Sequence, residues 1–75
     1  MHLDPIFLSE YGPNASTSKI QQEKDSLESY HTSLMVKMVR ESDTWSFNQT
    51  NQHIVVMKQT KFKINYLQSL LNLQK

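Results

Sequence analysis

The feature that most constrains this chain is the position of its helix-breaking residues. Its only proline and glycine residues, Pro5, Gly12 and Pro13, all lie within the first 13 of 75 positions. Because Gly and Pro are the strongest interruptions of regular structure, the rest of the chain can form helix over nearly its whole length. The sequence therefore predicts an all-α protein with an extended N-terminal arm at residues 1–17 and a helical assembly domain at 18–75.

The predicted arm is unusually apolar for a segment without regular structure. Its large apolar residues are Leu3, Ile6, Phe7, Leu8 and Tyr11. A disordered tail usually contains fewer such residues. We therefore expect the arm to fold back over its own helices or to dock into a partner, and the sequence leaves both arrangements open.

The segment 18–41 has the pattern of an amphipathic helix with one buried face. Ser18 followed by Gln21 fits a capping box, in which each side chain satisfies a backbone N–H of the other residue. Thr17 or Ser16 could serve as the cap instead. The apolar residues that recur on one side at helical spacing are Ile20, Leu27, Leu34 and Met38. We expect this stripe to form one half of an intrachain core.

Residues 42–52, SDTWSFNQTNQ, leave two architectures open. Their Ser, Asp, Thr and Asn side chains compete for backbone hydrogen bonds, which favours a helical hairpin with helices at about 18–41 and 51–74. The Trp and Phe of this segment would then lie in the loop and insert into the end of the core. The alternative is one long continuous helix from about 18 to 74, because apolar residues also recur at 11-residue spacing.

The predicted helix at 51–74 has apolar residues around more than half of its circumference. The side expected to complete the intrachain core comprises Met57, Ile64, Leu67 and Leu71. The other side, about 170° away, comprises Val55, Phe62, Tyr66 and Leu73, with Leu70 between the two. A surface helix needs an apolar stripe of only about 100°. We therefore expect the second side and Leu70 to bind helices of other chains in a coiled coil or multi-helix bundle.

The charges of the chain are unevenly distributed between its two halves. Residues 1–43 hold seven acids and four bases, whereas residues 44–75 hold four lysines and no acid. Opposite charges favour antiparallel docking of the halves, and they equally suit an acidic partner for the second half. Lys58, Lys61 and Lys63 are the candidate contacts to such a partner. Four lysines without arginine make a small positive surface, which argues against a dedicated nucleic-acid-binding domain.

The sequence lacks the motifs that are typical of catalysis or cofactor binding. It has no cysteine, which excludes disulfides, thiolate zinc sites and cysteine nucleophiles. His2, His31 and His53 are far apart and do not have the spacing of a zinc site. There is no P-loop and no GxSxG sequence. We therefore expect no enzymatic activity, no metal or other cofactor and no small-molecule substrate.

Two further patterns concern location and role. No apolar run reaches the roughly 20 residues of a membrane helix, and the first residues do not resemble a signal peptide. These patterns predict an intracellular protein of the cytoplasm or nucleus without a membrane span. The expected role is a non-catalytic scaffold subunit that contributes helices to a homo- or hetero-oligomeric complex. The alternative is a small regulatory adaptor that binds nucleic acid or an acidic protein surface through the basic C-terminal helix.

Overall fold

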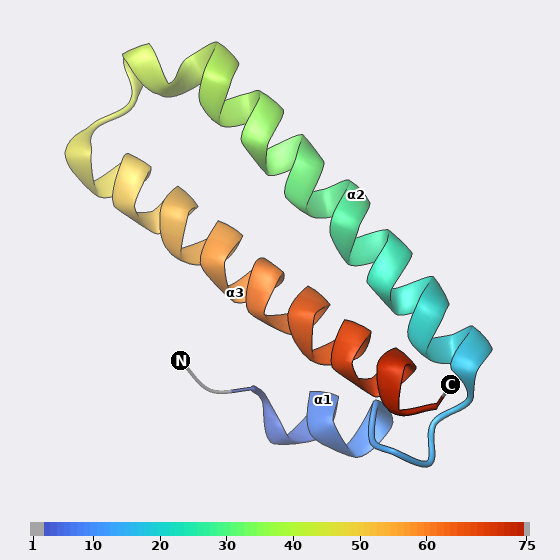
Figure 1. Ribbon diagram of the computed structural model, residues 1–75. Helices are drawn as coiled ribbons and strands as arrows, with labels where there is room; N and C mark the ends of the chain where they lie inside the picture. The colour runs from blue at the N-terminus through green and yellow to red at the C-terminus, as the bar shows by residue number, and fades with distance from the viewer. Residues whose placement is uncertain (1–2, 75) are drawn as a thin grey trace.

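Two long helices that lie antiparallel to each other form most of the molecule (Figure 1). The computed structural model describes residues 3–74, so Met1, His2 and Lys75 lie outside the described part of the chain. Helix α2 spans Thr17–Glu41 and helix α3 spans Phe47–Leu73. The predicted helical hairpin is confirmed, and the alternative of one continuous helix is wrong.

The N-terminal arm contains a short helix, α1, at Pro5–Glu10 where the sequence had predicted extended backbone. The carboxylate of Asp4 accepts a hydrogen bond of 2.7 Å from the backbone N–H of Ile6, which caps this helix. Pro5 occupies the first helical position, where its missing N–H leaves no intrahelical bond unmade. An Asp followed by Pro is therefore a helix start here, and the turn residues that follow it end the helix instead of preventing it.

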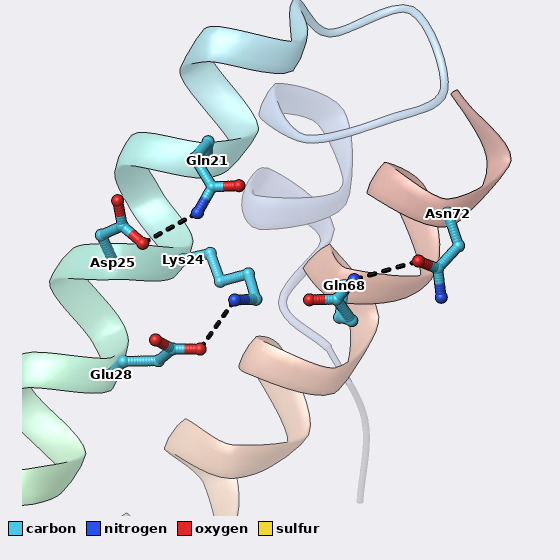
Figure 2. Close-up of polar contacts among 6 residues, drawn as sticks. All are labelled: Gln21, Lys24, Asp25, Glu28, Gln68 and Asn72. Atoms are coloured by element: carbon cyan, nitrogen blue, oxygen red, sulfur yellow. Dashed lines mark hydrogen bonds and ion pairs between the residues drawn. The ribbon is translucent and has the colours of Figure 1, made fainter. Parts of the chain in front are cut away.

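Helix α2 is capped by Ser16 and not by the predicted pair of Ser18 and Gln21. The Ser16 hydroxyl accepts a hydrogen bond of 3.1 Å from the backbone N–H of Lys19. The Gln21 side chain instead donates to the carboxylate of Asp25 at 2.8 Å, one turn further along (Figure 2). The helix consequently begins one residue earlier than predicted.

The hairpin turns through a single turn of 3₁₀ helix, η1, at Ser42–Thr44. Ser46 then caps α3 with a complete capping box: its hydroxyl accepts from the Gln49 N–H at 3.2 Å, and the Gln49 side chain accepts from the Ser46 N–H at 2.8 Å. Because these bonds satisfy the first free N–H groups, α3 begins at Phe47, four residues before the predicted start. Phe47 is 80% exposed in the first turn of α3, so the prediction that it inserts into the core is wrong.

The arm docks onto its own chain at the end of the hairpin opposite the turn, where the first turn of α2 lies beside the last turn of α3 (Figure 1). We call this the open end of the hairpin. The Tyr66 hydroxyl donates a 2.8 Å hydrogen bond to the carbonyl oxygen of Tyr11. The ring of Phe7 lies 4.9 Å from that of Tyr11 and 6.1 Å from that of Tyr66. The Gln74 amide donates to the carbonyl of Ala15 at 2.9 Å. The arm thus makes a third layer of packing at this end.

Candidate interaction surface

Within the described chain, buried side chains lie from the middle of α3 to the open end of the hairpin, and Ile20 and Leu67 are the most completely buried. The buried residues are Ile20, Thr60, Ile64, Leu67, Leu70 and Leu71. No side chain between residues 21 and 59 is buried, although the two long helices run side by side over that stretch. Two helices alone cannot enclose a side chain on all sides, and the arm supplies the missing cover at one end only. The half of the hairpin next to the turn, which we call the loop half, is therefore incompletely packed.

The residues predicted to form the intrachain core fall into two groups, one buried toward the open end and one only half-buried in the loop half. Ile20, Ile64, Leu67 and Leu71 are buried, and Leu27 is half-buried against the cluster that Ile20, Leu67 and Leu71 form with Leu70. The remaining predicted core residues, Leu34, Met38 and Met57, lie in the loop half and are only half-buried. Each of these three lines an open groove on the surface.

The residues predicted to face a partner also separate into two groups. Val55, Phe62 and Leu73 are exposed, which leaves them available for a partner. Leu70 is instead buried in the intrachain cluster, and Tyr66 is half-buried beneath the arm. These two positions therefore pack within the chain. Helical spacing placed Tyr66 on the second side of the helix and Leu70 between the two sides, but it could not reveal that the arm packs against both.

Helix α2 carries an exposed apolar surface that was not predicted from the sequence. Met35, Val36 and Val39 are all exposed, and Val39 is 84% accessible to solvent. With Thr32 and Arg40 they line a shallow groove whose lining residues all belong to α2. We call these five residues the α2 outer patch. The sequence signal was present, because at about 100° per residue Val36 falls roughly opposite Ile20 and Val39 about 100° away from it.

A second groove lies between the two helices in the loop half. Its lining residues are His31 and Met38 from α2 and Ile54, Met57, Lys58 and Lys61 from α3. We call it the lysine-rimmed groove. The arm does not cover it, since the arm packs against Tyr66 and Lys63 on another side of α3. The predicted lysine contacts are thereby separated: Lys58 and Lys61 share one groove, whereas the ammonium of Lys63 lies 5.2 Å from the ring centre of Phe7.

In the loop half, His53 of α3 makes one hydrogen bond to α2 and one aromatic contact to the turn. The Nε2 atom of His53 lies 2.7 Å from the backbone carbonyl oxygen of Leu34, a distance that requires Nε2 to carry the proton. The imidazole also packs against the Trp45 ring, with the ring centres 4.6 Å apart and the ring planes tilted by 47°. Trp45 therefore packs against α3 at the turn, which holds the loop end closed without burying any residue fully.

The electrostatics of the arm centre on one tyrosine. The Tyr11 hydroxyl donates a 2.8 Å hydrogen bond to the carboxylate of Glu23. This bond, together with burial and the negative charges of Glu23 and Glu10, raises the pKa of Tyr11 from 10.0 to about 12. The ammonium of Lys19 lies 5.1 Å from the ring centre of Tyr11. The arm is thus held by polar contacts as well as by apolar packing.

The candidate metal-ligating side chains are dispersed in the part of the chain that the structure describes. No group of three His, Cys, Asp or Glu side chains there could hold a metal ion. His31 lines the lysine-rimmed groove and His53 lies on another face, while His2 is outside the described residues. Among residues 3–74, no helix has a stretch that is long and apolar enough to span a bilayer.

Comparison with known proteins gives no guide to function. No family model matches the chain, and neither curated proteins nor solved structures show significant similarity to it. The physical features of the two exposed apolar surfaces are therefore the basis for a functional proposal.

Proposed function

We propose that this protein is a non-catalytic subunit that contributes its helical hairpin to a homo- or hetero-oligomeric helix bundle. The observation that carries the proposal is the absence of any buried side chain between residues 21 and 59. A hairpin of this length normally gains its stability by burying an apolar face. The loop half exposes such a face without covering it, and helices from another chain would complete the packing.

The α2 outer patch supports the same proposal from a second direction. Met35, Val36 and Val39 are exposed, and the groove that they line includes no residue of α3. Exposed apolar residues that form a contiguous patch usually mark an interaction surface. Methionine adapts its shape readily, which suits contact with a partner helix.

Site-specific photo-crosslinking in cells that make the protein tests the proposal. A photoreactive amino acid at Val36 should give adducts of discrete mass, either a dimer of the chain or a complex with one partner. The same amino acid at Ser26, an exposed polar position of α2, should give far fewer. Equal and diffuse labelling at both positions would contradict an assembly role.

The alternative of an adaptor that binds nucleic acid has less support. Phosphate binding uses many positive charges, whereas of the three lysines on α3 only Lys58 and Lys61 share a groove, and Lys63 faces the ring of Phe7. The two grouped lysines flank apolar side chains, which suits an acidic protein surface better than a phosphate backbone. Binding of labelled single- or double-stranded DNA that falls steeply between low and moderate salt would favour the nucleic-acid alternative.

A further inference from the structure

We propose that the lysine-rimmed groove binds an amphipathic helix whose apolar stripe is flanked by carboxylates. This inference rests on the proposed function, because it identifies one face of the hairpin and the chemistry of the helix that would cover it. The occupant is a partner helix of acidic character and not a second copy of this chain.

The shape and lining of the groove suit a helix. Met38, Ile54 and Met57 provide its apolar residues, and they come from both walls because the two helices run side by side. A third helix laid along two antiparallel helices contacts both of them through residues spaced three and four apart. The apolar stripe of such a helix would cover the side chains that the hairpin leaves half-buried.

The helix faces that line the groove are apolar near the turn and polar toward the open end of the hairpin. Lys24, His31 and Met38 follow one another at seven-residue spacing on α2, as do Ile54, Lys61 and Gln68 on α3, so each set shares a face. Toward the open end this face is polar and its side chains are paired. Lys24 contacts Glu28 at 2.8 Å, and the Gln68 amide donates to Asn72 at 3.0 Å (Figure 2). The part available to an apolar stripe is therefore the loop half.

The charge of the groove selects the partner. Helix α3 has no acidic residue, and the nearest acid on this face of α2, Glu28, is paired with Lys24. Among the described residues, neither Lys58 nor Lys61 has a carboxylate within ion-pair distance. Both lysines belong to the lining of the groove, and their flexible side chains can bring the ammonium groups to carboxylates that flank a bound apolar stripe. Such complementarity sets partner choice and association rate more than raw affinity.

A pair of designed helical peptides tests the inference directly. Both carry the same leucine stripe, with glutamates flanking it in one peptide and lysines in the other. Titration of the intact protein, followed by NMR, should show tighter binding of the acidic peptide. The shifts should centre on His31, Met38, Ile54 and Met57. Equal binding of both peptides, or shifts centred on the α2 outer patch, would overturn the proposal.

Charge reversal provides the matched variants. Lys61→Glu should weaken binding of the acidic peptide about fivefold or more at low salt, and less as salt screens the charges. Lys37→Glu, an exposed α2 lysine outside this groove, should have little effect. Equal effects of the two substitutions would contradict the assignment.

Two controls separate this inference from the proposed function. Concentration-dependent shifts of the groove residues without any peptide would assign the groove to a second copy and overturn the proposal. Loss of peptide discrimination with retained crosslinking at Val36 would overturn the groove assignment alone. Loss of both results would reject the assembly role as well.

Discussion

The Tyr66 hydroxyl donates a 2.8 Å hydrogen bond to the backbone carbonyl oxygen of Tyr11, which precedes it by 55 residues. This bond joins α3 to the end of the arm and closes the aromatic cluster that includes Phe7. It lies at the end of the hairpin that has a buried core. The arm therefore stabilises one half of the molecule and leaves the other half to depend on external packing.

Removal of this hydroxyl should destabilise the fold. Tyr66→Phe leaves the ring in place but deprives the Tyr11 carbonyl of its donor, so the free energy of unfolding should fall by about 1 kcal/mol. Urea denaturation followed by circular dichroism measures the change. Tyr30→Phe is the matched control, because the Tyr30 ring is half exposed on α2. Equal effects of the two substitutions would show that the arm contact contributes nothing.

Alkaline pH should weaken the docking of the arm. The pKa of Tyr11 is raised to about 12 in the folded chain, chiefly by its hydrogen bond to the Glu23 carboxylate. A tyrosine whose pKa is higher in the folded than in the unfolded state stabilises the fold below pH 10. That contribution is lost as the pH rises from 10 through about 12.

The tyrosinate absorbance of the wild type, compared with that of Tyr11→Phe, measures this titration. Tyr11→Phe should remove the tyrosine ionisation near pH 12 and should flatten the loss of stability above pH 10. Glu23→Gln should shift the Tyr11 ionisation toward its ordinary value. An unchanged alkaline titration in Glu23→Gln would contradict the assigned cause.

The capping box at the turn should have a measurable effect of its own. Ser46→Ala removes the hydroxyl that accepts from the Gln49 N–H, so the free energy of unfolding should fall by about 1 kcal/mol. Ser26→Ala lies within α2, where alanine is the better helix former, and it should not destabilise the chain. If both variants unfolded at the same urea concentration as the wild type, the cap would not determine where α3 begins.

Substitutions in the two halves should differ in their effect on the isolated chain. Ile20 is fully buried at the open end, and Ile20→Val should lower the free energy of unfolding by about 1 kcal/mol. Val39→Ala removes an exposed side chain from the α2 outer patch and should change stability by less than about 0.5 kcal/mol. Val39→Ala should instead weaken assembly. A large loss of monomer stability in Val39→Ala would mean that the patch is packed within the chain.

The helical hairpin could be predicted because the local signals were strong. Two breaker-poor segments flank a cluster of Ser, Asp, Thr and Asn, and that cluster contains the turn. The exact start of α3 was missed although Ser46 and Gln49 have the spacing of a capping box. The start of α1 was missed because Pro5 was interpreted as a residue that disfavours helix, whereas it occupies the first helical position.

The interaction surface was harder to predict because periodicity places a residue on a face without saying what covers that face. Leu70 was expected to face a partner and is buried within the chain, because α2 and the arm meet at that end. Val36 and Val39 fall outside the main stripe and therefore received no weight. Which half of a hairpin has a third layer depends on where the arm docks, and that contact joins residues far apart in the sequence.

The central claim is that the loop half of the hairpin lacks its own core and is completed by assembly. Amide hydrogen exchange at a concentration where sedimentation shows monomers tests it most directly. Amides at residues 64–71 should exchange slowest, and those at 32–39 and 50–57 should exchange roughly tenfold faster or more. Assembly should slow exchange in the latter two segments. Equal protection of both halves in the monomer, unchanged on assembly, would contradict the claim.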